Sequence, residues 1–291
     1  MSNLLEVHLG NKKMPDYFKN ILIPIDLSIN TDVAVNKGVE LADSGSTIHL
    51  LYVNNFGLPG PTRVVKRYVT ETNRFPDLEI IKKKINQWKD SIEESRNDIY
   101  VHTWIVLEDS VQKAIEKKAM QLAVDLIVIG KNSHHSWFPL FNTVVPSKLA
   151  QKTGIVVLTI KPGVIYKRTQ IIVVPVTSET AKHKMEVISA ICKKLRLKIY
   201  LVTFLNSVNE AADFSASSLL QVYQCLKSTH SHVEYTVLDG HNKAKAIMEY
   251  AEKINADILL AQPEAETKIG WQDRCISDVL SIGSKVQIWA V

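Results

Sequence analysis

The sequence lacks any stretch that could cross a membrane, and it contains little cysteine. No apolar run approaches the roughly 18 residues that a membrane-spanning helix requires. The N-terminal segment also lacks the basic region and apolar core of a secretory signal peptide. The three cysteines, Cys192, Cys225 and Cys275, are scattered without the spacing of metal ligands. We therefore expect a cytoplasmic protein without a membrane segment, whose cysteines are plain thiols of the apolar core.

Catalytic motifs are absent as well. The sequence has no Gly-x-Ser-x-Gly nucleophile motif, no P-loop and no His-Glu-x-x-His zinc motif. The segment DLSINTD at 26–32, which follows the first expected strand, lacks the glycines of a dinucleotide-binding turn. These absences favour a protein that is not an enzyme. A slow nucleotide hydrolase is the enzymatic alternative, but no candidate base stands beside a plausible phosphate site.

The charge is mildly positive, with a formal net charge of +5 and a pI of about 8.9. Lysine and arginine are spread over many segments and are densest at 82–84 and 193–198. No recognisable DNA- or RNA-binding module accompanies them. We therefore interpret the positive charge as solvated helix faces and do not expect a nucleic acid as partner.

Apolar segments alternate with segments of helical periodicity. Hydrophobic residues make up 46% of the chain, which is enough for a packed core. In the first half, apolar strands are expected at 21–25, 47–53, 99–107, 126–129 and 155–160. Thr31 or Asp32 is expected to cap the first helix, and 108–110 the helix after the third strand. This order predicts an α/β fold with a five-stranded parallel sheet and helices on both faces.

The pattern then repeats. Pro175 follows Pro24 by 151 residues, and the strand KIYLVTF at 198–204 follows TIHLLYV at 47–53 by the same offset. Further on, the segment at 246–261 corresponds to 114–129, and VQIWAV at 286–291 corresponds to IVVLTI at 155–160. Such self-similarity indicates a duplication. We expect two tandem Rossmann-like (HUP-type) domains at 17–161 and 169–291, each with its own core.

The first half resembles the universal stress protein family. The resemblance is carried by the strand that runs through Pro24 to Asp26, by the strand LLYV that ends at Val53, and by DLIVIG, which ends at Gly130. It is weaker over 169–291. Many members of the family bind ATP at the carboxyl ends of the strands, through an Asp and a motif Gly-x2-Gly-x9-Gly-(Ser/Thr). The resemblance therefore implies ATP or AMP as a ligand of the first half, held by residues at seven positions: Pro24, Asp26, Val53, Gly130, Ser133, Thr143 and Val144.

This motif is degenerate in the present sequence. Gly130 matches the first glycine, but Ser133 and Thr143 stand at the second and third glycines, and Val144 replaces the hydroxyl residue. The loss of one hydrogen bond to a phosphate would cost ~1.5–3 kcal/mol, a tenfold to hundredfold loss of affinity. In the second half, Thr177 stands at the aspartate position and Gln262-Pro263 replaces the Gly130 region. We therefore expect a stress-response binding module with a degenerate pocket; the alternative is a nucleotide sensor.

Other segments could contact a protein partner. Trp137–Phe141 and the long excursion at 54–75 are the candidates, although the aromatic residues are interpreted first as packing against the protein itself. His134 and His135 are interpreted as solvated residues, not as metal ligands. In the family the last strands of two domains pair antiparallel, so the resemblance implies this pairing for the terminal strands at 155–160 and 286–291, which would close two exposed sheet edges. Each half is expected to keep a sheet of its own. A homodimer and an unknown protein partner are left open.

Overall fold

The structure is a computed structural model in which parts of the chain are described. The described residues are 18–26, 28–54, 78–130, 144–160, 171–176, 182–204, 212–229, 232–239, 243–261 and 286–291. Within them, no helix is long and apolar enough to pass through a bilayer.

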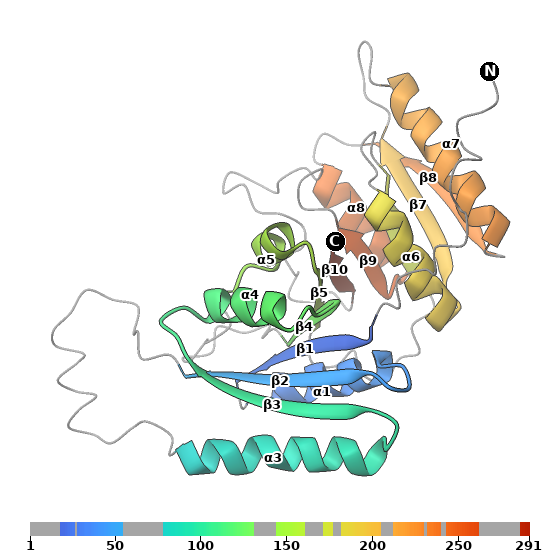
Figure 1. Ribbon diagram of the computed structural model, residues 1–291. Coiled ribbons are helices and arrows are strands. Elements are labelled where there is room, and N and C mark those ends of the chain that lie inside the picture. Colours follow the sequence, from blue (N-terminus) through green and yellow to red (C-terminus); the bar gives the residue numbers. More distant parts are fainter. Residues whose placement is uncertain are drawn as a thin grey trace, which may run out of the picture.

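In the first half, strands and helices alternate along the chain (Figure 1). The elements are β1 (Asn20–Ile25), α1 (Ile29–Leu41), β2 (Thr47–Asn54), α3 (Leu78–Ser95), β3 (Tyr100–Leu107), α4 (Val111–Gln121), β4 (Leu126–Gly130), α5 (Pro146–Thr153) and β5 (Val156–Ile160). The five expected strands are therefore confirmed, and none of their ends differs from the expected residue by more than one position. Ser110 caps α4 as expected, because its side chain accepts a hydrogen bond from the backbone N–H of Lys113.

The start of α1 differs from the expectation. Its N-cap is Ser28, whose hydroxyl accepts a hydrogen bond from the backbone N–H of Asn30, so Thr31 and Asp32 already lie inside the helix. The reason is that Asp26 accepts hydrogen bonds from both Ser28 and Thr31 and so fixes the turn before the helix. The prediction of a cap at Thr31 or Asp32 was wrong.

The second half repeats this order. Its described elements are β6 (Ile171–Pro175), α6 (Lys182–Leu195), β7 (Lys198–Phe204), α7 (Ala212–Thr229), β8 (Val233–Leu238), α8 (Lys243–Lys253), β9 (Ile258–Ala261) and β10 (Gln287–Ala290). Cys192 on α6 is buried as expected, whereas Cys225 on α7 is exposed. The core prediction for Cys225 was wrong because the buried residues Val222 and Leu226 of the same helix face the sheet instead.

The ten strands form one sheet in the order β3-β2-β1-β4-β5-β10-β9-β6-β7-β8. Within each half all neighbouring strands are parallel, which confirms the α/β fold class. Between the halves, β5 and β10 run antiparallel, with Leu158 opposite Trp289. The expectation that each half keeps a separate sheet was wrong, because hydrogen bonding between two edge strands joins their sheets into one.

Helices cover both faces of this sheet (Figure 1). On one face, buried residues of α1, α3, α6 and α7 belong to a single apolar cluster that runs through both halves and includes Trp289. On the other face, α4 and α5 cover the first half and α8 covers the second, each over a cluster of its own. One layer of the core is thus shared by the whole described molecule.

Equivalent contacts support the repeat. The backbone N–H of Asp125, just before β4, donates to the carbonyl of Asn20, and Asp257 donates to Ile171 in the same way. The side chain of Asp125 also accepts hydrogen bonds from three backbone N–H groups at 18–20, and Asp257 accepts one from Ile171. An aspartate therefore ties the first strand of each half to the strand beside it.

Candidate functional site

The candidate site lies where β1 and β4 separate. In a parallel sheet of this order, chain connections leave these two strands toward opposite faces, and ligands bind at the carboxyl ends there. β1 pairs with β2 over six residues, but with β4 only at Ile21 and Leu22. Pro24 has no N–H to donate, and β1 is no longer paired with β4 at that point. The divergence of these strands leaves room for the start of α1.

Asp26 stands at the carboxyl end of β1 and organises this start. Its Oδ1 accepts hydrogen bonds from the Ser28 N–H at 3.0 Å, the Ser28 hydroxyl at 2.5 Å and the Thr31 hydroxyl at 3.0 Å. Thr31 in turn accepts a hydrogen bond from the Asp26 N–H at 3.1 Å. One carboxylate oxygen is therefore used by the protein itself.

Gly130, the last residue of β4, lies against the backbone of α1. A Cβ at this position would lie 2.2 Å from the carbonyl oxygen of Asn30 and 2.8 Å from its carbonyl carbon. Real Cβ atoms do not come so close to backbone, so only glycine fits. The close approach that this glycine permits is made by the protein's own helix, which accounts for the glycine without a ligand.

Asn30 is buried beside this contact. Its Nδ2 donates to the Ser28 hydroxyl at 3.0 Å, but its Oδ1 has no hydrogen-bond partner among the described residues. A buried acceptor without a partner is costly and rare in folded proteins. Together with the positive end of α1, this gives the site an unsatisfied acceptor next to N–H donors. Sequence reasoning missed Asn30, because only its position in the first turn of the helix brings it to Gly130.

Val53 and Val144 are apolar parts of the same region. Both are buried and belong to the cluster beneath α4 and α5, together with Val111, Ile129 and Leu149. Next to Val144, the N–H of Val145 donates to the side chain of Gln112 at 3.3 Å. At the position where the family motif has a hydroxyl, this chain therefore has a packed core residue.

Tyr52 is a further residue of the site that sequence reasoning missed. It is the partner of Ile25 across β1 and β2, so it lies next to the strand end that carries Asp26. Burial raises the pKa of Tyr52, and the negative charge of Asp26 raises it further. The available signal was strand register, since residues in register at the ends of parallel strands are neighbours.

Several predicted residues lie outside the described part of the chain. They are Ser133, Thr143, His134, His135, Trp137–Phe141, 55–75, Thr177, Gln262, Pro263 and Cys275. Of the seven positions implied by the family motif, Asp26 and Gly130 both contact the start of α1, and Pro24 lies two residues before Asp26 on β1. Val53 and Val144 lie in the adjoining core.

A second polar cluster lies between β2, β3 and α4. The Nε1–H of Trp104 donates to Nδ1 of His49 at 3.2 Å, and His49 stacks on His102 at 5.6 Å between ring centroids. The Lys118 ammonium lies 4.1 Å from the centre of the Trp104 ring. Burial lowers the pKa of His49 to about 4, and the charges of His102 and Lys118 act in the same direction. Among the described residues, no group of three or more metal-ligating side chains is present.

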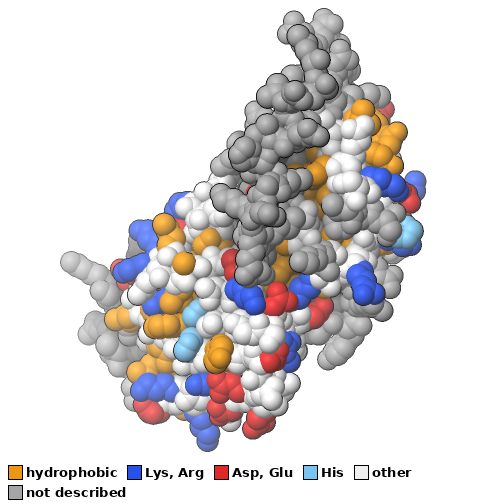
Figure 2. Space-filling model, turned by 45° about the vertical axis from the view of Figure 1, so that its right-hand side comes forward, with side chains coloured by type: hydrophobic (Ala, Val, Ile, Leu, Met, Phe, Trp, Pro, Cys, Tyr) orange, Lys and Arg blue, Asp and Glu red, His pale blue; other side chains and the backbone are white. Residues whose placement is uncertain are grey.

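Charges are mixed on the surface. On the face shown in Figure 2, the described lysine and arginine side chains lie interspersed with aspartate and glutamate. Elsewhere in the described chain, opposite charges also pair directly, as in Lys37–Glu40 and Lys152–Glu116. On the described part of this face, positive charge is therefore not gathered into one continuous surface.

Comparisons with known proteins agree with this fold. The chain is similar to a universal stress protein from Archaeoglobus fulgidus at 16% identity and a TM-score of 0.63, over 94% of this chain and 97% of the other. It is similar to a putative universal stress protein from Pseudomonas aeruginosa at 14% identity and a TM-score of 0.58, over 95% and 94%. The cytoplasmic domain of a prokaryotic cation chloride cotransporter matches at 9% identity and a TM-score of 0.53, over 93% and 94%.

These structural similarities extend over both halves and concern the fold alone. A search of curated protein sequences gives no match. The sequence model described as "Universal stress protein family" matches residues 17–161. This matched segment contains both Asp26 and Gly130. The chain therefore belongs to the universal stress protein family.

Proposed function

We propose that the protein is a cytoplasmic, non-enzymatic stress-response module that binds through contacts other than a standard nucleotide site. It is built from two tandem units at 17–161 and 169–291. The antiparallel pairing of β5 and β10 supports an arrangement in which these units dock on each other within one chain. Trp137–Phe141 and the excursion at 54–75 are the segments proposed to contact a protein partner.

The observation that carries this proposal is the state of Asp26. One oxygen of the carboxylate that the family uses to contact the base, Oδ1, already accepts three hydrogen bonds from the turn that starts α1. A ligand that needs this oxygen must displace them, at about 1 kcal/mol for each hydrogen bond. Val144 adds to the argument, because it packs in the core and has no hydroxyl for a phosphate.

Nucleotide binding in the first half is the second candidate, and Asn30 favours it. Its buried Oδ1 has no partner among the described residues and lies at the positive end of α1. The described residues also donate no hydrogen bond to Oδ2 of Asp26, so that oxygen remains for an amino group of ATP or AMP. Such a site would bind the base more strongly than the phosphates.

Calorimetric titration of the full chain with ATP and AMP separates the two candidates. The degenerate-pocket proposal predicts no binding heat up to about 1 mM, that is, a binding free energy weaker than about −4 kcal/mol. Binding in the micromolar range would contradict it. In that case Asp26→Asn should weaken binding by about tenfold or more if the site is the one described.

The matched control is Asp109→Asn, which removes the same charge from an exposed position beyond β3. Circular dichroism of both variants checks that the overall helix content is unchanged. Equal effects of the two substitutions would place the nucleotide elsewhere. Release of inorganic phosphate from ATP by the wild type, and not by Asp26→Asn, would contradict the proposal that the protein is not an enzyme.

A further inference from the structure

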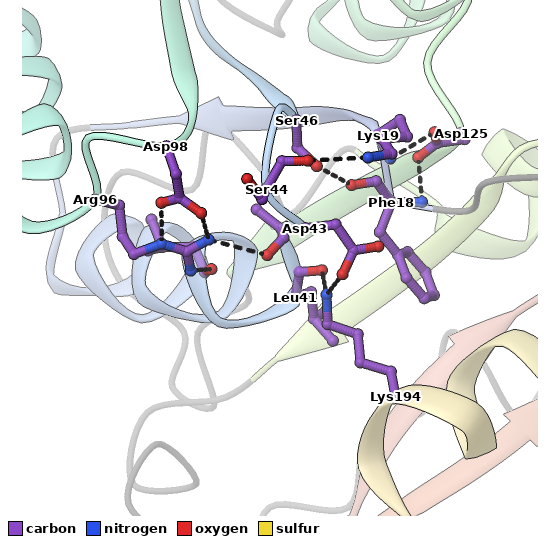
Figure 3. A network of polar contacts seen from close by, with 12 residues as sticks. Phe18, Lys19, Leu41, Asp43, Ser44, Ser46, Arg96, Asp98, Asp125 and Lys194 are labelled. Carbon is purple, nitrogen blue, oxygen red and sulfur yellow. Dashed lines mark hydrogen bonds and ion pairs between the residues drawn. The ribbon is translucent and has the colours of Figure 1, made fainter.

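An ion pair joins the two halves of the chain beside the shared core (Figure 3). The ammonium of Lys194, near the end of α6, lies 2.6 Å from Oδ1 of Asp43, just after α1. The same ammonium donates to the carbonyl oxygen of Leu41, the last residue of α1. It also lies 5.9 Å from the centre of the Phe18 ring. The Lys194 side chain is 19% exposed and that of Asp43 is 49% exposed.

Asp43 and Lys194 occupy equivalent positions of the repeat. They are 151 residues apart, which is the offset that relates Pro24 to Pro175 before them and Thr47 to Lys198 after them. The pairing of Asn20 with Thr47 and of Ile171 with Lys198 supports this equivalence in the sheets. Two equivalent residues touch each other only where a twofold axis passes between them.

The strand pairing between the halves has the same symmetry. Leu158 and Trp289 are equivalent in the alignment of 155–160 with 286–291, and they lie directly opposite each other in the sheet. The flanking pairs, Thr159 with Ile288 and Val157 with Ala290, are exchanged by the same axis. A pseudo-twofold axis therefore passes through the pair Leu158/Trp289 and through the pair Asp43/Lys194.

A charge on such an axis decides which partner can dock. Two copies of the first half would bring Asp43 against a second Asp43, and two copies of the second half would bring Lys194 against a second Lys194. Opposite charges meet only when a first half docks on a second half. In that arrangement Lys194 also compensates the negative end of the α1 dipole. We infer that Asp43 and Lys194 make this surface a docking site for the opposite half of the chain and not for a second copy of the same half. This inference concerns the surface of β5 and β10 and does not depend on what the crevice at Asp26 binds.

Charge exchange in the full-length protein tests this inference. The variants are Lys194→Asp, Asp43→Lys and the double exchange of both residues. The readout is hydrogen exchange of the backbone amides of β5 and β10, with the amides of β2 as an internal reference. Of the two single variants, Lys194→Asp disturbs fewer other contacts. Asp98 is the main cause that raises the pKa of Arg96, but the charge of Asp43 also contributes, so Asp43→Lys would affect Arg96 as well.

Each single variant should speed exchange in β5 and β10 by about tenfold relative to β2, because like charges then meet on the axis. In the double exchange, opposite charges meet again on the axis with their positions reversed. Amide exchange should then return to within about threefold of the wild type. Matched controls are Lys89→Glu and Glu93→Lys, which change the net charge on α3 and should leave β5 and β10 unchanged.

Failure of the double exchange to recover would overturn the inference, because a contact that merely caps α1 is lost in that variant whereas a contact on a symmetry axis is rebuilt. Single variants without a local effect at β5 and β10 would overturn it as well. If a variant fails to fold, the conservative pair Lys194→Gln and Asp43→Asn replaces it. Removal of one charge should then speed exchange by about threefold, and removal of both by no more than that.

Discussion

At Gly130 the backbone of α1 passes so close to β4 that a single methyl group has no room. The presence of a glycine at this position has two explanations. The family motif relates it to phosphate binding, while the structure relates it to the carbonyl of Asn30. Sequence reasoning found the residue because it ends the segment DLIVIG and matches the first glycine of the family motif. It could not find the reason, because the neighbour that excludes a Cβ comes from a helix one hundred residues earlier in the chain.

Gly130→Ala should therefore destabilise the protein by about 3 kcal/mol or more, since neither strand nor helix backbone can move away cheaply. Urea unfolding of the full chain measures this change in the free energy of unfolding. Gly45→Ala is the matched control: Gly45 has φ +76° but no atom within 4 Å of a Cβ position. Its cost should be only about 1–2 kcal/mol, from the left-handed conformation. Equal losses in both variants would contradict the steric argument.

At the scale of elements, the strands were predictable, whereas side-chain contacts between elements were not. The order of strands and helices followed from hydrophobic periodicity, and the two prolines at 24 and 175 mark the same step in both halves. In each half the first strand pairs over only two residues with the strand toward the other half: β1 with β4, and β6 with β9. By contrast, the cap at Ser28 depends on the Asp26 side chain, and the pairing of His49 with Trp104 depends on register. Neither follows from the period of one segment.

His49 makes the packing of β2, β3 and α4 sensitive to acid. Its pKa is lowered from 6.5 to about 4 in the folded protein, so the unfolded chain binds more protons between these values. Stability contributed by neutral His49 is therefore complete above pH 6.5 and is lost as the pH falls toward 4. The loss should reach at most about 3 kcal/mol. The measurement is the free energy of unfolding from pH 7.5 to 4, compared between the wild type and His49→Asn.

In that comparison, His49→Asn should be less stable at neutral pH and less dependent on pH below 6.5. His232→Asn serves as the control, because His232 is exposed just before β8 in the second half and takes no part in the contact between His49 and Trp104. A wild-type profile that runs parallel to that of His49→Asn would show that the buried imidazole does not couple folding to protons.

At the scale of the whole molecule, the repeat predicted two docked units but not one sheet. Antiparallel pairing of the terminal strands and two separate sheets cannot both hold, because the pairing itself continues the hydrogen-bond ladder. Pairing prevails for a physical reason: it satisfies two open edges at once and buries Trp289 against Phe18, with ring centroids 6.0 Å apart. Hydrophobic periodicity alone cannot show which edge a strand pairs with, and the expectation of this pairing came from the family resemblance.

The shared core makes a specific prediction about cooperativity. Since one apolar cluster runs through both halves, the wild type should unfold in a single calorimetric transition. Trp289 is fully buried in this cluster, and Trp289→Ala should cost about 3–5 kcal/mol. Because the lost contacts lie between the halves, calorimetry of Trp289→Ala should resolve two transitions.

Trp88→Ala is the control for this experiment, because Trp88 packs on the same cluster from α3, within the first half alone. It should lower the transition temperature without dividing the transition. Two transitions in the wild type would mean that the halves fold independently and that the contact at Trp289 contributes little. A single lowered transition in Trp289→Ala would mean that the helices on both faces couple the halves without it. The predicted division therefore tests whether the pairing of β5 with β10 holds the two halves together as one cooperative unit.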